Sequence, residues 1–324
     1  MNLMNALFKA ANLHSEIIFA AGDGSTVKEY RDFKISRYPD FDYFDIPLCR
    51  VEAGGIAYYI GTESFYTPMG TSSFDGSIYW DFAGMTTNTI ELADEKMKNL
   101  TISKVLYSIR ENGSVDYSFE KLLYGAEVGA FRKKYVEMVP EDRFRHFQAL
   151  LGSISQAAAA TSELLTDVES YPARMFFTSH IPNLATVDGD TMKISIAELE
   201  RSVAKFSKSK RSVPIAVTGC EEKRITVSIQ FPEQWEQVEY VPETYEIVDP
   251  LNPAEIWYSC KVAQAVKDGR LEITFAIEIF ERPDYMLPSA YAAILQEIET
   301  RISSRHAKTI IVRKGRKPDN ERLD

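Results

Sequence analysis

Cysteine and histidine are scarce in this chain, and their scarcity argues against several classes of protein. The 324 residues include three cysteines and four histidines, and Cys49, Cys220 and Cys260 lie far apart. That spacing fits neither a disulfide framework nor a zinc site. No two histidines stand at the spacing of metal ligands on one helix. We therefore expect buried free thiols, no metal and no cofactor.

Long apolar runs are also missing. No stretch approaches the roughly 20 apolar residues that a membrane-spanning helix needs. The N-terminus has no charged segment, continuous apolar segment or cleavage site, so it does not look like a signal peptide. The net charge of −10 is spread along the chain, which argues against a general nucleic-acid surface. The sequence thus predicts neither a membrane span nor a nucleic-acid partner.

The composition that remains is ordinary for a soluble globular protein. Hydrophobic residues make up 45% of the chain and charged residues 26%. The 17 tyrosines and 18 phenylalanines favour β structure. A chain of 324 residues is long enough for two or three domains with sizeable cores.

The N-terminal stretch predicts a short helix that leads directly into a buried strand. The apolar residues of the helix share one face: Leu3, Met4, Leu7, Phe8 and Ala11. The strand Ile17–Phe19 follows with almost no linker. A helix and strand of this kind form part of a domain core, so the chain looks as though it begins in the middle of a domain. The uncovered face of the helix predicts contact with a second copy of the chain or with a missing partner segment.

Three segments, in order along the chain, carry a resemblance to a known family. They are LMNALFKAANLHSE at 3–16, FDYFDIPL at 41–48 and YYIGTESFYTPMG at 58–70. Together they resemble bacterial transglutaminase-like proteins, whose core is papain-like. In that family the catalytic cysteine begins the first helix, and its position would fall just before Met1. Tyr43 stands at the position of the catalytic histidine, and Gly61 at that of the acid.

The resemblance implies a degenerate site beside an aromatic loop. In the resembled enzymes the loop that contains Phe65, Tyr66 and Pro68 borders the substrate groove. We therefore take these three residues, with Tyr58, as candidate binding residues. A relocated nucleophile at Cys49 is a weaker alternative. The family is often exported to the periplasm, so a longer parent protein could carry a signal that this chain lacks.

The whole chain is expected to be α+β, with a truncated papain-like core followed by two β-rich domains that contain a few helices. The predicted units are a partial core at 1–85, a middle domain at 86–204, a C-terminal domain at 205–316 and a disordered tail at 317–324. A hairpin is predicted around Glu111–Ser114. Two helices are expected on either side of Pro140, and a third near 291–302.

Three functions remain open. The first is a non-catalytic transglutaminase-like protein or fragment that binds a peptide or protein partner. The second is the C-terminal part of an active cysteine transglutaminase or protease, whose cysteine lies upstream or in another chain. The third is a carbohydrate-binding accessory module built on the two β-rich domains. In-frame codons for Gly-x-Cys directly upstream of Met1 would favour the second function over the first.

Overall fold

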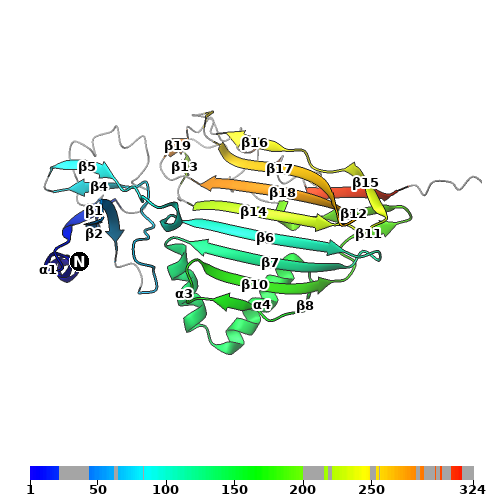
Figure 1. Cartoon of the computed structure of the whole chain (residues 1–324), viewed down its shortest axis with the longest axis horizontal. Coiled ribbons are helices and arrows are strands. Elements are labelled where there is room, and N and C mark those ends of the chain that lie inside the picture. The colour runs from blue at the N-terminus through cyan, green and yellow to red at the C-terminus, as the bar shows by residue number, and fades with distance from the viewer. Residues whose placement is uncertain are drawn as a thin grey trace, which may run out of the picture.

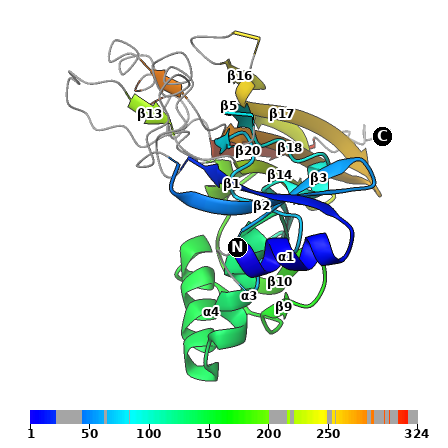
Figure 2. The same cartoon turned by 90° about the vertical axis from the view of Figure 1, so that its left-hand side faces the viewer.

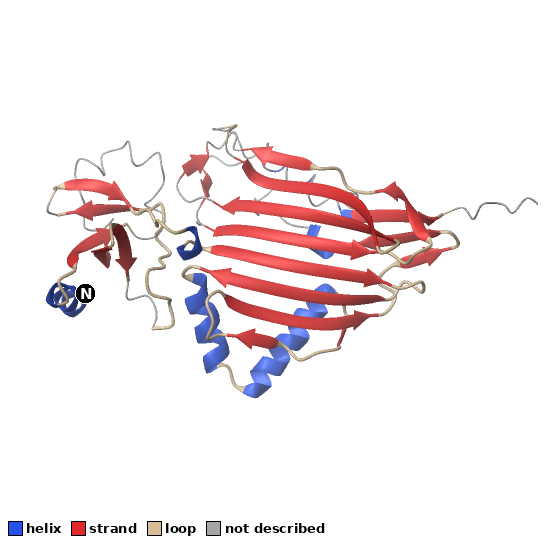
Figure 3. Ribbon diagram, in the orientation of Figure 1, coloured by secondary structure: helices blue, strands red, loops and turns tan. Residues whose placement is uncertain are grey.

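The architecture is that of a β-rich protein with few helices, in a computed structural model (Figures 1 and 3). The residues that it describes are 1–21, 44–61, 65–82, 84–199, 215–217, 221–248, 253–254, 256–281, 285–287, 296, 300 and 308–315. Some sequence predictions lie outside these residues: the role of Tyr43, the burial of Cys220, most of the helix near 291–302, and the tail.

The N-terminal part of the chain forms a five-stranded antiparallel sheet, here called the small sheet. Its strands are β1 (His14–Ala20), β2 (Ile46–Ala53), β3 (Ile56–Ile60), β4 (Ile78–Asp81) and β5 (Thr86–Thr89). Their order in space is β3-β2-β1-β4-β5, so β3 and β5 are its edges. Because β5 pairs with β4, this unit runs past the boundary expected at residue 85.

Helix α1 (Asn2–Ala10) lies against β1 and β2, as Figure 2 shows. The Ser15 hydroxyl donates a hydrogen bond of 2.7 Å to Oδ1 of Asn5, which ties the helix to the strand after it. The helix contains no buried residue, and Leu7 is 61% exposed. The helix meets the sheet through the side that carries Asn5 and the half-buried Phe8, so Leu7, which helical spacing places on the same apolar face as Phe8, does not pack onto the sheet.

Most of the remaining strands form a nine-stranded sheet, here called the large sheet. Its main path is β16-β17-β18-β14-β6-β7-β10-β8, and β9 also pairs with β10. These strands are β6 (Leu100–Ile109), β7 (Val115–Tyr124), β8 (Ala159–Ala160), β9 (Leu165–Asp167), β10 (Ala173–Ile181), β14 (Glu221–Gln230), β16 (Tyr245–Val248), β17 (Ile256–Lys267) and β18 (Arg270–Glu281). The hairpin predicted around Glu111–Ser114 is confirmed as β6–β7.

Two helices cover part of one face of the large sheet. They are α3 (Glu127–Glu137) and α4 (Pro140–Ile154), and Pro140 begins the second helix as the sequence predicts. Phe147 of α4 meets Phe177 of β10 edge to face, with ring centroids 5.4 Å apart. Figure 1 shows both helices along the β10 side of the sheet.

A four-stranded sheet adds to the same core. Its order is β11-β12-β20-β15, with β11 (Thr186–Asp188), β12 (Thr191–Ser195), β15 (Trp235–Tyr240) and β20 (Thr309–Lys314). Short elements complete the fold: η1 (Glu95–Met97), η2 (Ala197–Leu199), and the pair of β13 (Ile215–Val217) with β19 (Tyr285–Leu287).

The structure corrects the domain boundary expected at residue 204. Strand β14 pairs in parallel with β6, and β20 pairs with β12, so strands from both expected domains share their sheets. One continuous core includes Tyr107 and Phe177 from the first segment and Phe275 and Val312 from the second. The described strands of the large and four-stranded sheets, which come from both expected domains, therefore belong to one folded unit.

The large sheet has one buried face and one solvent-exposed face. Along β6 and β10, buried apolar residues alternate with more exposed and mostly polar ones, because successive strand residues point to opposite faces. The buried residues face α3, α4 and the four-stranded sheet within one core.

Among the helices of the described part of the chain, none is long and apolar enough to cross a membrane.

Candidate functional site

Three strand ends lie together at one end of the small sheet: the end of β1, the start of β2 and the end of β3. In the pairing register, Ala20 at the end of β1 lies opposite Ile46 at the start of β2, and Cys49 lies opposite Ile60 at the end of β3. Burial raises the pKa of Cys49, and the positive N-terminus of the chain acts on it in the opposite direction. The pairing register therefore brings these three strand ends to the same end of the small sheet.

One of the two positions that the resemblance assigns to the histidine and the acid, Gly61, belongs to this end of the sheet. Gly61 directly follows β3 and is half-buried, whereas Tyr43 falls outside the described residues. The next residue, Phe44, is buried against Trp80, with ring centroids 6.2 Å apart. The structure thus places Gly61 at this end of the sheet and leaves the position of Tyr43 as a prediction.

The predicted aromatic loop is held from both sides. A Cβ atom placed on Gly70 would lie 3.2 Å from Cδ1 of Tyr58 and 3.3 Å from Sδ of Met97, and Gly70 has a φ of +88°. Glycine is the residue that fits both the positive φ and the close approach. On the other side, a Cβ on Gly129 of α3 would lie 2.4 Å from Oγ1 of Thr67. The loop is therefore clamped between β3 and α3.

Internal hydrogen bonds fix the loop further. The hydroxyl of Thr71 donates to the carbonyl of Pro68 over 2.7 Å, and the Thr71 N–H donates to the same oxygen over 3.2 Å. On this frame the side chain of Phe65 is 98% exposed and that of Met69 is 78% exposed. Phe65 and Tyr66 meet edge to face with centroids 5.7 Å apart. The result is an apolar, aromatic projection on a fixed base.

The four candidate binding residues are thus brought together in part. Phe65, Tyr66 and Pro68 share the loop, and Tyr58 reaches it from β3 through its contact with Gly70. Exposed aromatic rings of this kind contact apolar or aromatic groups of a partner, and their burial on binding contributes strongly to interface energy. The arrangement suits recognition.

The described cysteines are poor nucleophiles. Cys49 is fully buried, and burial raises its pKa above the ordinary value of 9.0. Burial also raises the pKa of Cys260 to about 11, although its contact with Tyr258 acts in the opposite direction. A thiol catalyst needs the reverse shift, because the thiolate is the reactive form. Cys220 lies outside the described residues.

Among the described residues, no histidine is hydrogen-bonded to a cysteine. His14 is exposed at the start of β1. His146 lies 2.9 Å from the Tyr135 hydroxyl, and its pKa is lowered by burial and then by the charge of Lys134. His306 falls outside the described residues. Within the described part of the chain, no cluster of three or more acidic, histidine or cysteine side chains could hold a metal ion.

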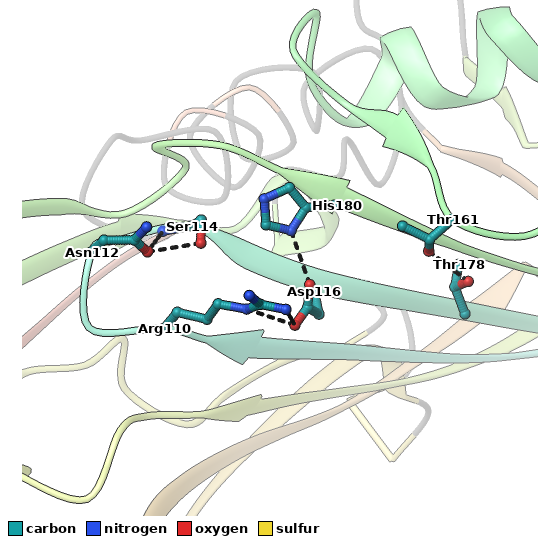
Figure 4. A network of polar contacts seen from close by, with 7 residues as sticks. All are labelled: Arg110, Asn112, Ser114, Asp116, Thr161, Thr178 and His180. Carbon is teal, nitrogen blue, oxygen red and sulfur yellow. Dashed lines mark hydrogen bonds and ion pairs between the residues drawn. The ribbon is translucent and has the colours of Figure 1, made fainter.

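A polar cluster that sequence reasoning missed lies beside the β6–β7 turn of the large sheet (Figure 4). Nδ1 of His180 lies 2.9 Å from Oδ1 of Asp116. Nε and an Nη of Arg110 donate to Oδ2 of the same carboxylate over 2.9 and 2.7 Å. The hydrogen bond to His180, followed by that to Arg110, lowers the pKa of Asp116 below its ordinary value of 3.8.

The cluster borders an open hollow of about 410 Å³. Ser108, Arg110, Asp116, Gln234 and Arg270 are among the residues that line it. Asp116 holds the His180 ring in place, which is how carboxylates orient a general base. In the described residues no thiol or hydroxyl is hydrogen-bonded to His180, so the cluster has no nucleophile positioned for attack. No signal in the sequence pointed to this cluster, because Arg110 follows β6, Asp116 lies in β7 and His180 lies in the distant strand β10.

Comparisons with known proteins leave the family open. No protein-family model matches the chain, and no curated protein matches it. Among solved structures, the chain is similar to a crystal structure described as "a putative protease" from Parabacteroides distasonis, with 10% identity and a TM-score of 0.40. The match covers 96% of this chain and 42% of that chain, so the present chain spans less than half of the length of that protein. Similarity at this level defines neither a family nor an activity.

Proposed function

We propose that the chain is a transglutaminase-like protein or fragment that binds a peptide or protein partner and has no catalytic activity of its own. The partner contacts the loop of Phe65–Gly70, beside strand β3. The remainder of the chain, built on the large sheet, serves as the scaffold against which α3 holds this loop.

The topology of the small sheet supports the papain-like part of the proposal. The start of β2 and the end of β3 lie at one end of the sheet. In the resembled family these two places carry the histidine and the acid. In this chain the sequence has Tyr43 shortly before β2 and Gly61 directly after β3. Neither side chain can replace the group that a cysteine-dependent acyl transfer requires.

The observation that carries the binding function is the exposure of Phe65. A phenylalanine that is 98% exposed contributes nothing to the folded core, yet its loop is clamped by Tyr58, by α3 and by Thr71. A preorganised loop loses little conformational entropy on binding, which favours affinity. An exposed aromatic group on a fixed base therefore supports a contact surface more than a structural element.

The proposal is tested with a labelled peptide. The probe is a fluorescein-labelled heptapeptide, here called the test peptide. Threonine occupies every other position, and the positions between hold valine, except for the central one, which holds tyrosine. Phe65→Ala should weaken its binding at least tenfold, measured by fluorescence anisotropy. The matched control is Phe144→Ala on α4, which removes another ring that is 65% exposed and should leave the dissociation constant unchanged.

Two results would contradict the proposal. One is equal binding of the test peptide by the wild-type protein and by Phe65→Ala. The other is incorporation of an amine into a glutamine-containing peptide by the chain alone, with loss of that activity in Cys49→Ala. The second result would instead support a relocated cysteine nucleophile.

A further inference from the structure

Strand β3 is an edge strand without the usual protection. It forms one side of the small sheet, and its sequence Ile-Ala-Tyr-Tyr-Ile contains no charge and no proline. Its register with β2 is regular along its whole length. Natural sheets block such edges with charges, prolines, bulges or very short strands, because an open edge is a template for another strand.

The other described edges carry at least one of these features or are polar. Strand β8 is only two residues long, and β11 only three. Strands β15 and β16 have register shifts and contain glutamates. Strand β5, the opposite edge of the small sheet, is entirely polar. Among the edges with described side chains, β3 is the one that is apolar, regular and uncharged.

The turn before β3 shows which backbone groups face outward. Gly54 and Gly55 have φ values of +60° and +80°, as a type I′ hairpin turn requires. In that turn the N–H of Ile56 points to the carbonyl of Ala53, towards β2. Because bonding directions alternate along an antiparallel strand, the N–H and C=O groups of Ala57 and Tyr59 point away from β2. Among the described residues, no backbone hydrogen bond from outside the β2–β3 ladder reaches these two residues.

We infer that β3 takes up an extended, uncharged peptide as an additional strand, hydrogen-bonded to Ala57 and Tyr59. This inference rests on the proposed function and specifies how the partner binds. An extended main chain is the ligand whose donors and acceptors repeat at the spacing that this edge offers. The contact of Tyr58 with Gly70 places the exposed aromatic loop next to the same edge, where it can contact the peptide's side chains.

The apolar side chains of β3 determine the kind of peptide. Ile56 is 38% exposed, and Tyr58 and Ile60 on the same face are half-buried. Peptide side chains on this face meet aliphatic and aromatic groups, and no charge on β3 is available to pair with a charged residue. The expected partner is therefore an extended segment rich in β-branched and aromatic residues.

The decisive experiment changes the main chain of the ligand. The test peptide is compared with an analogue that is N-methylated at alternate residues on the edge that would face β3. N-methylation removes the donors but keeps the side chains. We expect at least a tenfold loss of affinity for the methylated peptide with the wild-type protein. Equal affinities, or no binding of the unmethylated peptide, would overturn the inference.

A protein variant provides the second arm. Ala57→Pro removes the outward N–H of Ala57, whereas Ala57→Val adds a side chain of similar bulk and keeps the donor. We expect at least a tenfold loss for the proline variant and less than a threefold change for the valine variant, with thermal unfolding as the check on folding. If Ala57→Pro unfolds, the methylated peptide still decides the question without any variant.

The outcomes separate this inference from the proposed function. Loss of binding in Phe65→Ala without any effect of Ala57→Pro or of methylation would retain the loop as the site and overturn strand addition. A concentration-dependent dimer, measured by sedimentation and abolished by Ala57→Pro, would show that the edge pairs with a second copy of this chain and would likewise overturn the inference.

Discussion

The two sheets of this chain differ in how they bury their residues. The large sheet buries one face in a single core that it shares with two helices and the four-stranded sheet. The small sheet has two minor clusters, one around Leu48 and Tyr59 and one around Phe44 and Trp80, and a helix with no buried residue. Its exposed apolar groups include Leu3, Phe65 and Met69.

That difference indicates that the large sheet contributes mainly to stability and the small sheet mainly to binding. A large continuous core supplies most of the free energy of folding, because the hydrophobic contribution grows with the apolar area buried. A sheet with small clusters contributes less and can leave apolar groups exposed for a partner. We therefore expect core changes in the large sheet to affect stability, and changes at β3 or Phe65 to affect binding.

The largest predicted effect concerns the unit that the sequence expectation treats as a separate domain. A fragment of residues 213–316 should show no cooperative unfolding transition. Strand β14 would lose its parallel partner β6, and β20 would lose β12. The full chain is the control. A fragment that melts cooperatively in circular dichroism would restore the domain boundary at residue 204 and contradict the shared core.

Core truncation should destabilise the large sheet far more than α1 truncation destabilises the small one. Phe275 is fully buried, so Phe275→Ala should lower the free energy of unfolding by about 3–5 kcal/mol, measured in urea. Leu7 is 61% exposed, so Leu7→Ala should cost less than about 0.5 kcal/mol. Similar costs for the two variants would remove the contrast between the sheets.

The smallest effect is a pH dependence at the polar cluster. The contacts with His180 and Arg110 lower the pKa of Asp116 below 3.8 in the folded protein. A lowered folded pKa gives stability that is present above the ordinary value and lost as the pH falls through the folded value. Because Asp116 and Arg110 are well exposed, Asp116→Asn should lower the melting temperature by only about 1–2 °C at pH 7.

The same variant should lose its deficit in acid. As the pH falls below the lowered folded pKa of Asp116, the wild-type carboxyl becomes protonated, so the two proteins should melt at the same temperature. Asp188→Asn, on the exposed strand β11, is the matched control and should show no such convergence. A deficit for Asp116→Asn that persists or grows in acid would show that the carboxylate does not stabilise this cluster.

Local features of the fold were predictable from the sequence. The β6–β7 hairpin follows from alternating apolar residues on both sides of Asn112-Gly113, and the two helices follow from helical spacing around Pro140. These signals are short-range, since a turn or a helix start depends on residues within a few positions. The candidate loop at Phe65 was identified from the resemblance, and its binding role stays a prediction.

Long-range pairing could not be predicted in this way. Strand β14 lies beside β6 although the two are far apart in the chain, and alternation is compatible with many partners. The link of Tyr107 and Tyr117, which face each other in the β6–β7 hairpin, to the distant Glu198 carboxylate is also long-range. Likewise, His180 meets Asp116 of that hairpin only because β10 pairs with β7. Nor could helical spacing show that α1 would leave Leu3 and Leu7 exposed.

Amide hydrogen exchange, followed residue by residue in the full chain with and without the test peptide, tests the central claim most directly. The account predicts that the peptide slows exchange at Ala57 and Tyr59, whose N–H groups face outward, and leaves Tyr58 and the strands of the large sheet unchanged. Protection that appears in β6, β7 or β10 and not at Ala57 and Tyr59 would contradict the assignment of binding to the small sheet.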